Sequence, residues 1–164
     1  MASPGSDRIK KNSLALINQD DTTQSTVSSG TTAKTIAGTV IDFPPGYVGR
    51  GLVYKIILAG TKTSTNGVHT VTLLLGTTTL MTLTSAAGTA SDWQAQFHVM
   101  FTSGSAQKVT GWYLAQALAV ACDYAVGTVD CHGGVQMKCQ ITPTSGDTIK
   151  CEMCLVEEMA SYLK

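Results

Sequence analysis

Four of the five cysteines and one histidine lie between positions 131 and 154, and their spacing resembles that of metal sites. Cys151 and Cys154 are separated by two residues, a spacing shared by many zinc ligands and redox-active thiols. Cys131, His132 and Cys139 precede them. Thiolate sulfur and imidazole nitrogen are the ligands that zinc prefers. Whether these side chains can meet at one ion depends on the secondary structure that carries them.

The segment around Cys151 has the pattern of a β-strand, D-T-I-K-C-E-M-C-L-V-E-E. Successive side chains of a strand point to opposite faces. Cys151 should therefore share one face with Ile149, Met153 and Leu155, while Cys154 faces the other side. Only a bulge in the strand could bring both sulfurs to one zinc ion, because zinc-binding pairs of this spacing usually occupy tight turns.

We therefore expect buried thiols, and neither a metal ion nor a cofactor. Cys139 shares its face with apolar residues of the preceding strand, and cysteine packs as a small hydrophobic residue. Cys131 and His132 are the two expected in a turn, beside Gly133. A redox pair would need a helix N-terminus to lower the thiol pKa, and a strand does not supply one.

Motifs of common enzymes do not occur in the sequence. It contains no G-x-S-x-G, H-E-x-x-H or phosphate-binding loop. His69, His98 and His132 have no serine, cysteine or carboxylate at a motif spacing. We expect no enzyme, although triad partners can lie far apart in sequence and a carbohydrate-active or lyase-type sandwich enzyme stays an alternative.

Length and composition indicate one β-rich domain. The chain has 164 residues, of which 13% are charged, compared with about 25% in a typical protein. Threonine, serine and glycine replace the charged residues, as in strands and turns rather than helix bundles. Eleven basic and eleven acidic residues give zero formal charge, so we expect no nucleic-acid partner.

The sequence also predicts the cellular compartment in which the protein is made and folds. Its N-terminus has no apolar core of a secretory signal, and no run approaches the eighteen or so apolar residues of a membrane span. We expect synthesis in a reducing cytoplasm, no membrane partner, and cysteines that begin as thiols.

The order of strands and turns predicts the fold class. About eight β-runs alternate with turn signals, which is typical of an antiparallel β-sandwich, and specifically of a jelly roll. The clearest run is W-Q-A-Q-F-H-V-M-F, whose alternate residues are large and apolar. Its inward set is Trp93, Ala95, Phe97, Val99 and Phe101.

Residues 1–34 differ from the sandwich domain expected at 35–164. They are polar, and we interpret them as an extended N-terminal arm that is a disordered tail or becomes ordered on a partner. Its candidate partner-binding residues are Arg8, Ile9, Lys10, Lys11, Leu14, Leu16 and Ile17. The apolar members would act as anchors, and the basic cluster is either solvated or in contact with an acidic surface.

Four segments together resemble a β-sandwich family of tailed bacteriophages, which contains capsid decoration (cement) proteins and fibre tips. They are G-R-G-L-V-Y-K-I-I-L-A-G-T, V-T-L-L-L-G-T-T-T-L, S-D-W-Q-A-Q-F-H-V and S-G-D-T-I-K-C-E-M-C-L-V-E-E. The resemblance spans about two-thirds of the chain, from Gly51 to Glu157, and rests on the order and spacing of the segments. The cysteines depart from the family pattern.

The resemblance implies a structural virion protein with no active site to carry over. It would bind the outer surface of a tailed-phage head, with the major capsid protein and copies of itself as partners, commonly as a trimer. Its location would be the capsid surface of the virion, after synthesis in the host cytoplasm. The alternative within the same family is the receptor-binding tip of a tail or head fibre.

Overall fold

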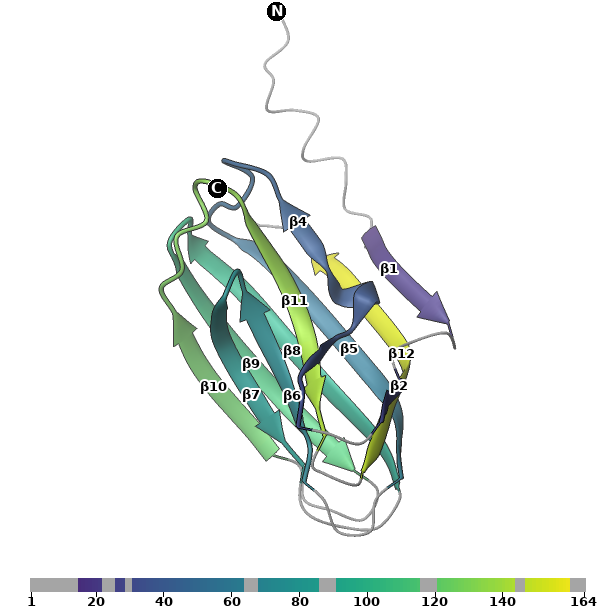
Figure 1. Cartoon of the computed structure of the whole chain (residues 1–164). Coiled ribbons are helices and arrows are strands. Elements are labelled where there is room, and N and C mark those ends of the chain that lie inside the picture. The colour runs from purple at the N-terminus through teal and green to yellow at the C-terminus, as the bar shows by residue number, and fades with distance from the viewer. Residues whose placement is uncertain are drawn as a thin grey trace, which may run out of the picture.

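The computed structural model describes residues 15–21, 26–28, 31–63, 68–85, 91–115, 121–143 and 147–159. These residues form twelve β-strands and one turn of 3-10 helix, η1 (Ala37–Thr39), and all strand pairs are antiparallel. The strands belong to two sheets that enclose a common apolar core (Figure 1). The prediction of an all-β, antiparallel fold is confirmed.

The larger sheet has seven strands and contains the longest ones. In spatial order they are β1 (Ala15–Asp21), β12 (Thr148–Met159), β5 (Leu52–Thr63), β8 (Ser91–Ser103), β9 (Ala106–Ala115) and β10 (Ala121–Gly127), and β2 (Thr26–Ser28) also pairs with β12. Within the described residues, β10 ends this order on one side (Figure 1).

The smaller sheet has five strands. Its order is β3 (Lys34–Thr35), β11 (Val135–Thr142), β6 (Thr70–Leu75) and β7 (Thr78–Thr84), and β4 (Ile41–Phe43) pairs with the other end of β11. The two-residue turn between β6 and β7 begins at Gly76, whose positive φ of 63° suits the tight hairpin.

Alternation along each strand builds the core between the sheets. The five inward residues predicted for the tryptophan run lie in β8 and are at most 2% exposed. Each such large apolar side chain stabilises the fold by roughly 1.5–3 kcal/mol. The sheets approach closely where Gly111 of β9 faces Met81 of β7, since a Cβ at Gly111 would lie 2.5 Å from the methionine sulfur.

Part of the N-terminal segment pairs with the body of the protein. β1 and β2 both lie along β12, on the side of β12 that β5 does not occupy (Figure 1). These polar segments join the sheet through main-chain pairing, which an apolar pattern does not reveal. They account for two of the strands beyond the eight that the sequence predicts, and β10 is a further one.

No helix in the described ranges has the length and apolar character to cross a membrane.

Candidate functional site

The Cys151–Cys154 pair departs from regular strand alternation because β12 contains a bulge. Cys151 pairs with Gly60 and Met153 pairs with the adjacent Ala59, so Glu152 is the extra residue. A bulge of this kind shifts the alternation by one position. Both cysteine side chains are fully buried, whereas Met153 is 42% exposed. The expectation that Cys154 faces away from Cys151, and that Met153 points inward, was wrong.

Gly60 on β5 makes room for the bulge. A Cβ at this position would overlap the main-chain carbonyl oxygen of Lys150. A glycine inside a strand often marks a bulge or a close approach of two backbones. Gly60 was therefore the residue in the sequence that could have indicated a bulge, although it lies on β5 and the bulge lies on β12.

Three thiols consequently gather in the core between the sheets. Cys139 of β11 joins Cys151 and Cys154 of β12, and all three are fully buried. Burial, and then the neighbouring Cys154, raises the pKa of Cys151 to about 12 and that of Cys139 well above its ordinary value. The Cys151 thiol donates a hydrogen bond to the carbonyl oxygen of Met153 at 3.3 Å. Neutral thiols in this setting pack as apolar side chains, as predicted for Cys139 and Cys151.

A second cluster is polar and buried, at the end of the core where β6 begins. The side chain of His69 is 1% exposed, and its Nε2 lies 2.6 Å from the hydroxyl of Tyr113. The Tyr113 ring stacks on Trp93, with ring centroids 6.3 Å apart. Ser85 holds the His69 backbone, because its Oγ accepts from the His69 N–H and its own N–H donates to the His69 carbonyl. The cluster fixes one imidazole among aromatic rings.

His69 is neutral at physiological pH. Burial, and then the nearby Lys62, lowers its pKa to about 4, while Asp147 acts in the opposite direction. Both Lys62 and Asp147 are themselves at least 97% buried. Among the described residues, His69 Nδ1 and Asp147 Oδ2 have no hydrogen-bond partner. Protonation of His69 would therefore cost free energy, and its imidazole is buried away from solvent.

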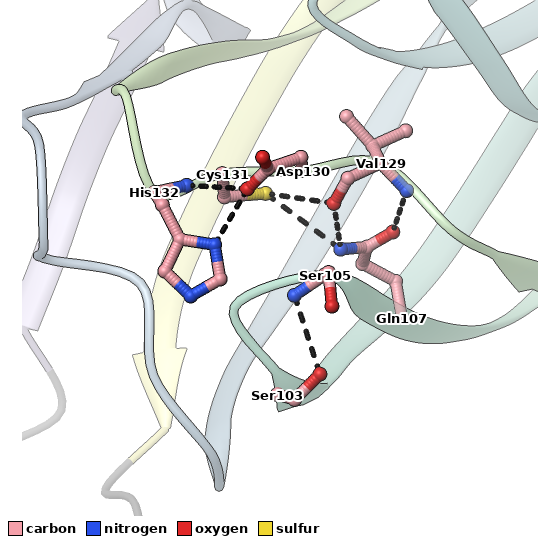
Figure 2. A network of polar contacts seen from close by, with 7 residues as sticks. All are labelled: Ser103, Ser105, Gln107, Val129, Asp130, Cys131 and His132. Carbon is pink, nitrogen blue, oxygen red and sulfur yellow. Dashed lines mark hydrogen bonds and ion pairs between the residues drawn. The ribbon is translucent and has the colours of Figure 1, made fainter.

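A third cluster, shown in Figure 2, orders the loop before β11. Gln107 is fully buried and makes two hydrogen bonds with the backbone of Val129, from its Nε2 to the carbonyl oxygen at 2.9 Å and from the Val129 N–H to its Oε1 at 3.0 Å. The Cys131 thiol donates to the same carbonyl oxygen at 3.4 Å. The Gln107 side-chain amide thus bonds both main-chain groups of Val129, as a neighbouring strand would.

Asp130 and His132 lie in the turn of the same loop, as the sequence predicts for His132. One carboxylate oxygen, Asp130 Oδ1, lies 2.6 Å from His132 Nδ1 and accepts from the His132 N–H. A carboxylate bonded to an imidazole supplies two of the three members of a catalytic triad. The other side of the ring faces Gly104, where a Cβ would lie 2.7 Å from Nε2, so the residue in contact there carries no nucleophile. The pair is a turn-forming contact.

The broadest feature is the outward side of the larger sheet, which we call the outer face. One row of opposed residues crosses it: Leu155, Ile57, Gln96 and Trp112. The next row is polar and contains Glu157, Lys55, His98 and Thr110, and the row beyond it contains Met159, Val53, Met100 and Lys108. Met100 and Met159 are about 40% exposed, and the other apolar members are half-buried. The outer face therefore carries two partly apolar rows, and apolar side chains gathered on one face can mark a contact with another protein.

Charges on the outer face neutralise one another. Lys55 and Glu157 form an ion pair at 3.5 Å, and Lys150 and Glu152 form another at 3.0 Å. Glu158 lies opposite the buried Tyr54, on the inward side of the sheet, and accepts hydrogen bonds from the hydroxyl groups of Tyr54 and Tyr47. A face with balanced charges suits a protein surface better than a nucleic-acid backbone.

The predicted partner-binding residues of the arm lie mostly outside the described residues. This is true of Arg8, Ile9, Lys10, Lys11 and Leu14. Leu16 and Ile17 belong to β1, where Leu16 pairs with Glu157 and Ile17 falls at an irregularity before Asn18. Their role as anchors stays a prediction.

The described ranges contain no group of three histidine, cysteine, aspartate or glutamate side chains placed to hold a metal ion. Comparison with protein-family models and with curated proteins finds no match for this chain.

Proposed function

We propose that this chain is a structural virion protein that decorates the outer surface of a tailed-phage head. Its two sheets would form a jelly roll, and its partner would be the major capsid protein. The proposal rests on the family resemblance of the four sequence segments, and the observation that supports it best is the outer face.

The outer face has the properties of a surface that binds another protein. It is wide, because it extends over β12, β5, β8 and β9, and it combines half-buried apolar side chains with paired charges. Interfaces between proteins are enriched in tryptophan, methionine and tyrosine and depleted of unpaired charge at their centre. Trp112 and Met100 supply such residues here.

A decoration role also fits what the three side-chain clusters do. The thiols, the His69 cluster and the Gln107 loop all stabilise the interior or a turn. A protein that reinforces a shell needs a rigid body and a contact surface, and no reacting group.

The N-terminal arm would add a second contact. The chain enters the sheet at Ala15, opposite Glu158, at one end of β12. The residues before it contain the basic cluster and Leu14, which we propose to contact neighbouring capsid subunits. Deleting all of residues 1–34 would also remove β1 and β2, so a deletion of residues 1–14 is the sharper test of this contact.

The experiment uses bare heads assembled from the major capsid protein of the phage that encodes this chain. Purified protein is mixed with the heads, the heads are sedimented, and the bound protein is measured. Met100→Lys places a charge in the outer face without adding volume, and we expect it to weaken binding at least about tenfold. Thr82→Lys is the matched control, since Thr82 is exposed on the smaller sheet.

Equal binding by the wild-type protein and Met100→Lys would refute the outer face as the contact. No binding of the wild-type protein to bare heads would refute decoration. The fibre-tip alternative predicts instead that the protein binds host cells and is absent from the shell of the head.

A further inference from the structure

We propose that β10 is a self-pairing edge, through which two copies of this chain join their larger sheets across a twofold axis. This inference does not depend on the capsid proposal, because it concerns purified protein alone. It begins with β10, whose strand partner within the described residues is β9, while β7 of the smaller sheet lies near its inward side.

Within the described residues, β10 pairs with β9 and with no other strand. Its outward side chains are among the most exposed apolar ones in the protein, with Tyr124 at 56% and Val126 at 63%. Cys122 and Asp123 are also exposed. An unprotected strand edge presents main-chain donors and acceptors that pair readily with another strand.

Natural edges are commonly protected by lysine, proline, bulges or short length. β10, A-C-D-Y-A-V-G, has seven residues, no lysine or proline, and a continuous register with β9. The opposite edge of the same sheet differs, because β1 contains Asp20 and Asp21 and an irregularity in its pairing. On the smaller sheet, the pairing of β7 with β6 is also interrupted by an irregularity.

The orientation of one main-chain group shows which residues face the open edge. The Tyr124 N–H donates to the carboxylate of Asp123, at 2.8 Å. Tyr124 therefore directs its N–H away from β9, and so do Cys122 and Val126 by the period of two. A second strand would replace the Asp123 carboxylate as the acceptor of the Tyr124 N–H.

The sequence of β10 is complementary to itself in the antiparallel direction. Tyr124 is its central residue, so a twofold axis there places Tyr124 opposite its own copy and Cys122 opposite Val126. Asp123 then lies opposite Ala125, and no like charges meet. Antiparallel pairing about this axis also keeps the two outer faces on the same side, as one continuous surface. This self-complementarity is why the occupant is a second copy rather than an unrelated peptide.

The contact is isologous and gives a dimer, in place of the trimer implied by the family resemblance. Sedimentation of the purified protein over a concentration series should therefore show a reversible doubling of the 17.2 kDa chain mass. Val126→Lys should raise the dissociation constant about tenfold or more, because the charge enters the contact twice. Thr77→Lys, in the exposed β6–β7 turn, is the matched control and should change nothing.

A cross-link tests the register itself. Opposed residues in a hydrogen-bonded antiparallel pair have Cα atoms about 5.5 Å apart, within the range of a disulfide. Tyr124→Cys combined with Cys122→Ser should thus give a covalent dimer under oxidised glutathione. The native Cys122 should not, since the pairing leaves its copy about 13 Å away.

The proposal is overturned by a protein that stays monomeric throughout the series, by a trimer mass, or by a dimer that Val126→Lys leaves intact. A dimer in which Tyr124→Cys gives no cross-link would overturn the register and hence the self-pairing edge.

Discussion

Cys151 and Cys154 point to the same side of β12, into the core, although a regular strand would point them to opposite sides. The bulge at Glu152 makes the difference, and it faces the smallest residue that the opposing strand can offer, Gly60. The two cysteines that resemble a metal motif in sequence are core residues of a strand whose side-chain alternation shifts by one position at the bulge.

Adding a methyl group at Gly60 should damage the fold, because the new Cβ would overlap the Lys150 carbonyl oxygen. We expect Gly60→Ala to lower the free energy of unfolding by about 1–3 kcal/mol, as overpacking typically does. Urea denaturation followed by fluorescence measures this. Gly49→Ala is the control, since no heavy atom lies within 4 Å of its Cβ position and its φ is not positive. Equal stability of both variants would contradict the bulge geometry.

One of the five thiols should react quickly with a thiol reagent. Cys122 is exposed, whereas Cys131, Cys139, Cys151 and Cys154 are buried. Burial also raises the pKa of Cys131, Cys139 and Cys151, which keeps the reactive thiolate scarce. Titration of the native protein should give one fast equivalent, which Cys122→Ser removes. Two or more fast equivalents would show that the core thiols are accessible.

Much of the fold follows from local pattern. The alternation of Trp93, Phe97 and Phe101 with polar residues places β8 in the core because a strand has one buried side. The bulge could not be placed, because its cause lies on a different strand from its effect. The strands β1 and β2 were missed because main-chain pairing, rather than apolar side chains, brings them to β12.

The clusters show the same limit. The sequence places His69 at the start of a strand, but only tertiary packing brings Tyr113 and Trp93 around it. The role of Gln107 likewise depends on Val129, which lies 22 residues further along the chain. The turn at His132 was predictable because Gly133 and Gly134 follow it, and Gly134 has a φ of 88°.

Stability should fall as the pH is lowered from about 6.5 to about 4. The folded state holds His69 neutral down to a pKa of about 4, whereas the unfolded chain takes up the proton near the ordinary value of 6.5. The stabilisation is fully present above pH 6.5, and about 3 kcal/mol of it is lost by pH 4. His69→Gln should flatten this part of the stability curve, while His132→Gln should retain it. An unchanged slope in His69→Gln would place the proton elsewhere.

Removing the Gln107 amide should unsettle the loop before β11. Gln107→Ala leaves the Val129 N–H without its side-chain acceptor and its carbonyl oxygen with the Cys131 thiol alone, which costs about 1–3 kcal/mol when the groups are shielded from water. Gln136→Ala is the comparison, because its hydrogen bond with Asp42 is exposed. Thermal unfolding of the two variants should differ, and a similar melting temperature would contradict the structural role of Gln107.

The most direct test of the proposed function is the number of copies of this chain in purified virions of the tailed phage that we propose to encode it. Quantitative mass spectrometry, calibrated against the major capsid protein, gives that number. A protein spread over the head surface should be present in hundreds of copies per particle. A handful of copies, or none, would contradict decoration of the capsid.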